Sequence, residues 1–145
     1  MWGMEPSMAG LFPVPPAHPT LLIADDDPVV RSMLSLTLDR HFDIVGAACD
    51  SHEAIALAQQ CRPDVALVDV QMPGGGGLSA VRGIAGVSPD TVSVVLSADE
   101  FDPLVRQLMI AGAMTYVRKG IAPTELADVL HRSIQAGPLA APAAA

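Results

Sequence analysis

The stretch VALVDVQMPGGGG, residues 65–77, joins a short apolar run to a carboxylate and four consecutive glycines. Because the residues before Asp69 are all apolar, 65–69 is expected to be a strand buried on both faces. Such strands are typical of parallel sheets that are covered by helices. The glycines predict a slack turn, since glycine loses more backbone entropy on ordering than any other residue. No Gly-Lys-Ser/Thr follows them, which argues against a phosphate-binding loop of the P-loop kind.

Strand and helix patterns alternate on both sides of this stretch. Apolar runs predict four more strands, at 20–24, 43–48, 91–97 and 114–118. The expected helices run from Asp27-Pro28 to about Arg40, from an N-cap at Ser51 to about Cys61, from near Leu78 to Ile84, from Asp102-Pro103 to near Gly112, and from Pro123 onward. Five strands alternating with five helices predict an α/β fold, with one doubly wound parallel sheet covered on both faces.

The composition favours one globular domain and argues against several classes of protein. The 145 residues are half hydrophobic and only 3% aromatic, so the chain can bury one sizeable core, which must be aliphatic. The formal net charge of −8 argues against direct nucleic-acid binding, which needs clustered Lys and Arg. No Lys or Arg precedes Arg31, unlike the start of a signal peptide, and no apolar run is long enough to span a membrane.

Composition also marks the expected domain boundaries. Residues 1–19 carry five prolines without periodicity and are predicted to be a disordered extension. Residues 137–145 resemble an Ala/Pro linker or tail, which leaves 20–136 as the folded domain. Cys49 and Cys61 have no His or Cys partner at metal-binding spacing. We interpret them as buried thiols in a reducing cytoplasm, with a disulfide as the less favoured alternative.

Polar residues that can carry chemistry collect at the ends of the predicted strands, namely Asp25, Asp26, Asp27, Asp69, Ser97 and Lys119, the only lysine. In parallel α/β sheets, sites form outside the C-terminal ends of the strands. An acidic pair there can hold Mg²⁺ through oxygen ligands, and Asp69 can act as a nucleophile that forms an aspartyl phosphate. The ammonium and the hydroxyl can then share the phosphoryl oxygens, so the set predicts a phosphoryl-transfer site.

Four segments, in this order, resemble the receiver domain of two-component response regulators: IADDDPVVR, DVALVDVQMPGGGGL, VVLSA and GAMTYVRKG. The resemblance covers 20–136 and implies a flavodoxin-like fold with strand order 2-1-3-4-5. It also implies that Asp69 takes a phosphoryl group from a histidine kinase or histidine phosphotransfer protein, with Mg²⁺ as cofactor. The implied role is a signalling switch that controls transcription or another output, with self-catalysed phosphoryl transfer and autodephosphorylation as its only chemistry.

By position, the resemblance implies a role for each site residue. The implied metal site comprises Asp25, Asp26, Asp69 and the backbone carbonyl of Gln71, with Asp26 and Asp69 as direct ligands; the phosphoryl contacts are Ser97 and Lys119, and the switch pair is Ser97 and Tyr116. Two positions depart from the family pattern. Gly76 stands where an acidic residue is common, and Gly120 stands where a cis proline is common, so we expect a trans bond there.

Each of these residues also has a simpler interpretation. The run Asp25–Asp27 could be only a helix cap, although that leaves two adjacent like charges without a cation. Asp69 could be a turn residue, Ser97 could bond to nearby backbone, and Tyr116 could be a half-buried core aromatic that also switches.

Three other functions remain as alternatives. One is a degenerate receiver that binds partners without phosphorylation. A second is a haloacid-dehalogenase-type phosphatase, which needs another aspartate two residues after the nucleophile, where this chain has Gln71. A flavin-binding flavodoxin would need a phosphate loop after the first strand, where three aspartates would repel phosphate unless a metal intervened.

Two helices carry apolar residues beyond those that one buried face needs. On the first helix, one stripe suits packing on the sheet (Val30, Leu34, Thr37, Leu38) and a second is a candidate docking site unless the last helix covers it (Val29, Met33, Leu36). By resemblance, kinase domains dock on this helix. Ile110 lies outside the apolar arc of the helix at 103–112, so a homodimer through the 103–136 face is a further expectation.

Overall fold

The computed structural model describes residues 18–99 and 102–138. Most of the predicted extension at 1–19 and of the predicted tail at 137–145 therefore lies outside the described residues. The strands are β1 (Thr20–Ala24), β2 (Asp43–Ala48), β3 (Val65–Asp69), β4 (Val92–Ser97) and β5 (Thr115–Arg118). The helices are α2 (Pro28–Leu38), α3 (Ser51–Cys61), α4 (Gly76–Val87), α5 (Pro103–Ala111) and α6 (Pro123–Ala136).

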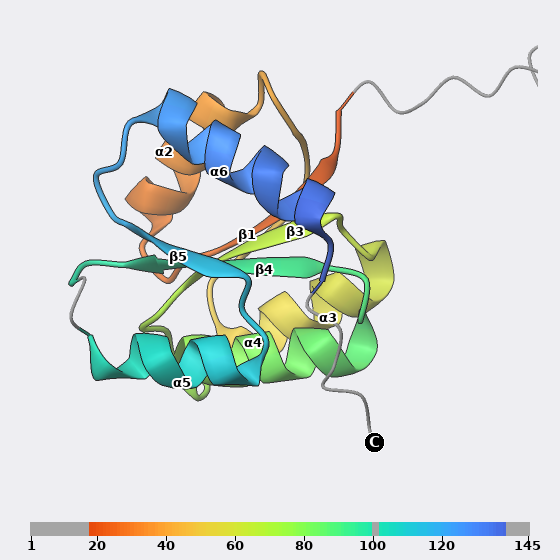
Figure 1. Ribbon diagram of the computed structural model, residues 1–145, viewed down its shortest axis with the longest axis vertical. Helices are drawn as coiled ribbons and strands as arrows, with labels where there is room; N and C mark the ends of the chain where they lie inside the picture. The colour runs from red at the N-terminus through yellow and green to blue at the C-terminus, as the bar shows by residue number, and fades with distance from the viewer. Residues whose placement is uncertain (1–17, 100–101, 139–145) are drawn as a thin grey trace, which may run out of the picture.

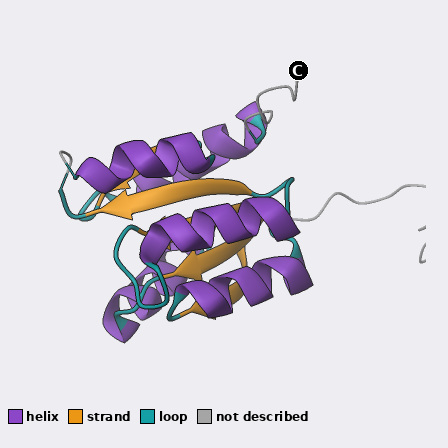
Figure 2. Cartoon of the chain, turned by 90° about the horizontal axis from the view of Figure 1, so that it is seen from below, coloured by secondary structure: helices purple, strands orange, loops and turns teal. Residues whose placement is uncertain are grey.

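The five strands form one parallel sheet in the order β2-β1-β3-β4-β5. Helices α2 and α6 cover one face, and α3, α4 and α5 cover the other, as Figure 1 shows. Figure 2, seen from below, shows helices that lie side by side and run roughly along the strands. The predicted fold class and the strand order implied by the resemblance are both confirmed. Among the described residues, no helix is both long and apolar enough to cross a bilayer.

The core is split between the two faces because successive strand residues point in opposite directions. Leu21 and Ile23 of β1 pack in the cluster under α2 and α6, which also contains Leu38 and Phe42. The intervening Leu22 packs in an alanine-rich cluster under α3 and α4. The core is aliphatic apart from Phe42, the aromatic residue in the described clusters.

Several predicted helix boundaries were wrong. The N-cap of α3 is Asp50, whose side chain accepts the Glu53 N–H at 2.8 Å, and Ser51 is already the first helical residue. Helix α4 begins inside the glycine run at Gly76 and extends to Val87, beyond the predicted 78–84. By contrast, both Asp-Pro starts are correct, because Asp27 and Asp102 each cap a helix that begins with proline.

The glycine run is a constrained turn, so the prediction of a slack one was wrong. Gly74, Gly75 and Gly76 all have positive φ, at 84°, 104° and 73°, a region that residues with a Cβ seldom occupy. Gly77 is needed for a different reason, since a Cβ there would lie 2.6 Å from the carbonyl oxygen of Asp69. The four glycines let α4 start directly against the end of β3.

The two cysteines differ from the prediction of buried thiols. Both are free, Cys49 is exposed and Cys61 is partly buried. The expected trans bond before Gly120 is confirmed, since no cis peptide occurs among the described residues. Gly120 has φ 94°, which suits glycine at the turn after β5.

Candidate functional site

The strand order brings the predicted site residues to one edge of the sheet. Chain segments after β1, β3, β4 and β5 meet there around an open cavity of about 460 Å³. The cavity is lined by Asp26, Asp69, Val70, Gln71, Ala98, Asp99, Asp102, Pro103 and Lys119. Most of these groups are polar, so the cavity suits a charged, hydrated ligand rather than an apolar one.

The acidic turn after β1 is held in shape by its own hydrogen bonds. The Asp25 carboxylate is fully buried, and its Oδ1 accepts the Asp27 N–H at 2.9 Å. Arg31, one turn into α2, donates from Nη1 to the Asp25 carbonyl at 2.8 Å. Asp26 is exposed at the cavity, while Asp27 points back to cap α2. Capping of α2 therefore explains Asp27 but not Asp25 or Asp26.

Asp69 and Lys119 form an ion pair at the centre of the site. Lys119 Nζ lies 3.0 Å from Asp69 Oδ2 and 3.5 Å from Asp25 Oδ2. The other Asp69 oxygen, Oδ1, accepts the Gln71 N–H at 3.4 Å. Lys119 follows directly after β5, and its N–H donates to the Ser97 carbonyl at 2.8 Å, which fixes its backbone to the end of β4. The sole lysine thus bridges two carboxylates that come from two other strands.

Burial and like charge act against ionisation of Asp69. Burial raises the pKa of the Asp69 carboxyl, and the negative charge of Asp25 raises it further; the hydrogen bond and charge of Lys119 and the Gln71 N–H offset only part of this. Although burial lowers the pKa of Lys119, its contacts with Asp69 and Asp25 raise it overall. Lys119 therefore carries a positive charge at neutral pH, and further positive charge at this edge would favour ionised Asp69.

The acidic residues fit a hard divalent cation. One oxygen from each of Asp25, Asp26 and Asp69 lies within 4.8 Å of the others, and no other such cluster occurs among the described residues. Asp25 Oδ2 is buried and accepts no hydrogen bond from the described residues, although the Lys119 ammonium lies 3.5 Å away. A buried carboxylate oxygen gains from a further cation or water that binds it directly. Carboxylate ligands with room for several waters are what Mg²⁺ prefers.

The two predicted switch residues lie on β4 and β5. Ser97 is fully buried, and its hydroxyl donates to the Asp99 carbonyl at 2.6 Å and accepts the Asp99 N–H at 3.2 Å. That local bonding is the simpler interpretation of Ser97, and it applies in this structure. Tyr116, on β5, is 38% exposed and so lies at the surface more than in the core.

Sequence analysis missed two acidic residues at the cavity. Asp99 and Asp102 both line it. Asp102 was identified only as the cap of α5, a role it has, since its Oδ1 accepts the Leu104 N–H at 2.9 Å. Asp99 follows the end of β4 by two residues, and this position after a predicted strand was a signal that could have found it.

Comparison with known proteins agrees with this geometry. The model of the response regulator receiver domain matches residues 21–131. The chain belongs to this family. Receiver domains are signalling modules rather than classical enzymes, and they bind Mg²⁺ at an acidic pocket.

Two curated relatives of this receiver domain are a transcriptional regulatory protein and a response regulator. It is 38% identical over 111 residues to the uncharacterized transcriptional regulatory protein YxjL of Bacillus subtilis, covering 75% of this chain and 51% of that protein. It is 37% identical over 114 residues to the response regulator GacA of Pseudomonas aeruginosa, covering 77% and 53%. The chain thus spans about half the length of these curated relatives.

Among solved structures, this receiver domain is similar to the signal receiver domain of the putative response regulator NarL from Mycobacterium tuberculosis. The TM-score is 0.77 at 27% identity, covering 83% of this chain and 98% of that one. A LuxR-family response regulator from Aurantimonas gives a TM-score of 0.76 at 25% identity, covering 83% and 87%. The similarity extends over nearly all of the described residues.

Proposed function

We propose that this receiver domain accepts a phosphoryl group on Asp69 from a histidine kinase or a histidine phosphotransfer protein. The observation that carries the proposal is the contact of the sole lysine with Asp69 beside the carboxylates of Asp25 and Asp26. Such a set supplies a nucleophile, a cation for the transferred oxygens and ligands for a metal. The residues that would hold Mg²⁺ are Asp25, Asp26, Asp69 and, through its backbone carbonyl, Gln71; the ion would neutralise charge on the phosphoryl oxygens.

The chain's own residues account for the reaction. A carboxylate oxygen of Asp69 attacks the phosphorus of a phosphohistidine, a P–O bond forms as the P–N bond breaks, and the imidazole leaves with the bonding electrons and takes a proton. Lys119 already lies 3.0 Å from Asp69 and can follow the developing negative charge. Ser97 would leave its bonds to Asp99 and donate its hydroxyl proton to a phosphoryl oxygen. Later attack by water on the phosphorus would break the P–O bond to Asp69, release inorganic phosphate and restore the carboxylate.

The alternative functions have less support. A degenerate receiver would be expected to lack part of the site, whereas all the chemical groups are present in this chain. A phosphatase of the haloacid-dehalogenase type needs a carboxylate where this chain has Gln71. The chain spans about half the length of its curated relatives. We also propose that the protein is cytoplasmic and controls transcription or another output; for the second part the support is the name of YxjL, a transcriptional regulatory protein.

The proposal is tested by incubating the protein with phosphoramidate or acetyl phosphate, with Mg²⁺ or with EDTA. Intact-mass measurement should detect one phosphoryl group per chain with Mg²⁺ and almost none with EDTA. The group should be stable in acid but released by base or hydroxylamine, as an acyl phosphate is. Absence of this label in folded protein would refute phosphoryl acceptance and favour the degenerate receiver.

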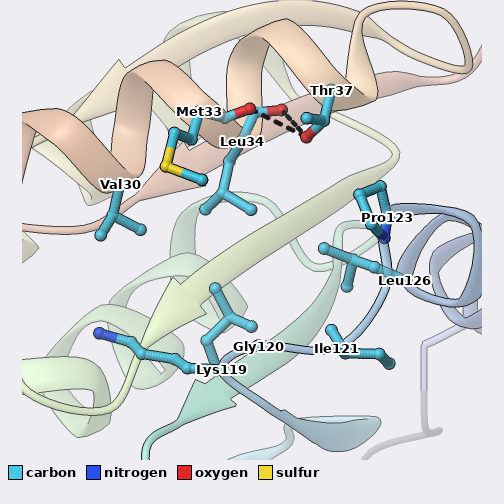
Figure 3. Close-up of a pocket in the computed structure, with 10 residues that line it drawn as sticks. Val30, Met33, Leu34, Thr37, Lys119, Gly120, Ile121, Pro123 and Leu126 are labelled. Carbon is cyan, nitrogen blue, oxygen red and sulfur yellow. Dashed lines mark hydrogen bonds between the residues drawn. The ribbon is translucent and has the colours of Figure 1, made fainter.

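We further propose that the partner docks on α2. Val29, Met33 and Leu36 are 64%, 60% and 77% exposed, so α6 does not cover this stripe. Met33 also borders an apolar cavity of about 230 Å³ between α2 and the start of α6, drawn in Figure 3. Lys119 lines the same cavity, so a partner seated there would lie close to the acceptor site.

Met33→Glu should slow phosphoryl transfer from a cognate kinase by roughly 10- to 100-fold, because it places a charge where an interface would bury the side chain. Labelling by phosphoramidate should stay within about twofold of wild type. A matched control is Ile110→Glu, at an exposed apolar residue on the opposite helical layer. Equal loss of both activities in Met33→Glu, or normal kinase transfer, would contradict docking on this stripe.

Phosphorylation is also proposed to promote self-association through the 103–136 face. Ile110 is 79% exposed on α5, and Tyr116 lies exposed on β5, the edge strand next to Ser97 of β4. Movement of Ser97 would let Tyr116 turn inward and change this face. Beryllofluoride, which mimics the phosphoryl group, should increase the sedimentation coefficient of wild type but not of Ser97→Ala, Tyr116→Ala or Ile110→Lys. Identical sedimentation of all four proteins with and without beryllofluoride would exclude the coupling.

A further inference from the structure

The Ser51 side chain forms hydrogen bonds with the loop between β3 and α4, which lies far from it in sequence. Ser51 is 1% exposed, and its hydroxyl donates to the carbonyl of Gly74 and, at 3.4 Å, to that of Pro73. Its backbone N–H also donates to the Pro73 carbonyl, at 3.2 Å. The first residue of α3 is therefore bonded to two successive carbonyls of the loop between β3 and α4.

Helix α3 does not need the Ser51 hydroxyl for its own N-terminus. Asp50 already accepts the Glu53 N–H, and the Glu53 carboxylate accepts the Cys49 N–H at 3.1 Å, which forms a two-way cap. A serine in the first turn of a capped helix can turn its hydroxyl elsewhere. Here the hydroxyl points to the loop, in a space so close that a Cβ on Gly74 would lie 2.6 Å from Ser51 Oγ.

The loop between β3 and α4 makes few side-chain hydrogen bonds of its own. Helix α4 begins at a glycine N-cap, Gly75, without a side-chain cap bond. Residues 74–77 have no side chains, so they bond to the rest of the loop only through their backbone, as the Gly77 N–H does to the Val70 carbonyl at 2.8 Å. Between Asp69 and this run lies Gln71, whose N–H bonds to Asp69 and whose backbone carbonyl is proposed to bind the metal. Motion of the loop backbone would therefore also displace Gln71 and Asp69, two of the proposed metal ligands.

We propose that Ser51 is a positioning residue, which holds the β3–α4 loop so that the Gln71 carbonyl faces the carboxylates of Asp26 and Asp69. This inference rests on the proposed function, since it assigns Ser51 to the same metal and phosphoryl site. Ser51 contacts neither the metal nor the phosphoryl group. Its hydroxyl supplies from α3 a side-chain hydrogen bond, which the glycine run has no side chain to make.

The test compares Ser51→Ala with Ser133→Ala. Ser133 is also buried and donates its hydroxyl to a backbone carbonyl, that of Val129 at 2.7 Å, but it lies on α6. In metal-free protein, amide hydrogen exchange of residues 71–77 should be faster in Ser51→Ala than in both wild type and Ser133→Ala. Mg²⁺ affinity, measured by calorimetry, should fall about three- to tenfold in Ser51→Ala alone, the change that one neutral hydrogen bond confers.

Ser51→Thr keeps the hydroxyl and should bind Mg²⁺ within about twofold of wild type. A Mg²⁺ affinity in Ser51→Thr as low as in Ser51→Ala would overturn the proposal. The size of the side chain, and not its hydrogen bond, would then determine the affinity. The proposal would also be overturned if Ser51→Ala showed the same amide hydrogen exchange in residues 71–77 and the same Mg²⁺ affinity as wild type. Failure of the proposed function is distinguishable, because it would appear in wild type itself as the absence of Mg²⁺ binding or of labelling.

Discussion

Asp69→Asn is expected to take up no phosphoryl group from phosphoramidate under conditions that label the wild-type protein completely. The amide is not nucleophilic towards phosphorus and cannot form an acyl phosphate, so the expected loss is total rather than partial. Intact mass measured over a time course with Mg²⁺ provides the readout. Peptide mapping of the labelled wild type should place the modification on the peptide that contains Asp69.

The matched control for this loss is Asp90→Asn, which makes the same change at an exposed position ahead of β4. It should be labelled at the wild-type rate. Labelling of Asp69→Asn at another carboxylate, such as Asp26 or Asp99 at the same cavity, would show that the site activates a different nucleophile.

The same variant should be more stable than wild type when metal is absent. Since burial and the charge of Asp25 raise the pKa of Asp69 in the folded state, folding favours the protonated carboxyl. The contribution of the protonated Asp69 carboxyl to the free energy of unfolding is fully present below the unfolded-state pKa of 3.8. It is lost as pH rises through the folded-state pKa. At neutral pH, Asp69→Asn should gain about 1 kcal/mol, or roughly 3 to 5 °C in Tm.

This gain should shrink as the pH is lowered toward 3.8, where the wild-type carboxyl becomes neutral as well. Thermal unfolding in EDTA between pH 4 and pH 8 measures it. A variant that is less stable than wild type at neutral pH would mean that the ion pair with Lys119 outweighs the cost of burying Asp69.

Asp26→Ala is expected to abolish the response to Mg²⁺. Binding to the folded state alone stabilises wild type by about 1.4 kcal/mol at a Mg²⁺ concentration ten times the Kd, or roughly 4 to 6 °C in Tm. Without the exposed carboxylate of the cluster, Tm should not change with millimolar Mg²⁺, and labelling by phosphoramidate should slow by at least about 100-fold.

The neighbouring aspartate provides the control for charge. Asp27→Asn also removes one negative charge from the turn, but asparagine caps a helix as well as aspartate does, so α2 keeps its N-cap. Asp27→Asn should retain the Mg²⁺ response and most of the labelling rate. An undiminished Mg²⁺ shift in Asp26→Ala would remove Asp26 from the metal site.

The strands were predictable because their cause is local. A strand buried on both faces is apolar at nearly every position, so 20–24 and 65–69 were located to the residue. The apolar run at 43–48 was located equally well, although β2 is a half-exposed edge strand. The Asp-Pro starts of α2 and α5 were equally clear, since a cap acts within two residues. The candidate site followed from the same logic, because parallel strands carry the residues after them to a common edge.

The contacts within the site depended on packing between distant segments. Lys119 meets Asp69 across 50 residues, and Ser51 meets Gly74 across 23 residues, so neither pairing has a local signal. The exposure of Met33 could not be predicted from the sequence either. Whether α6 covers this side chain depends on where α2 and α6 lie on the sheet. The need for glycine at 76 and 77 likewise arises from the approach of α4 to the end of β3, since a Cβ there would meet the Val70 or Asp69 carbonyl oxygen. The sequence alone determined which groups are present and at which edge; only the tertiary structure decided which atoms they contact, because those contacts depend on how separate elements pack.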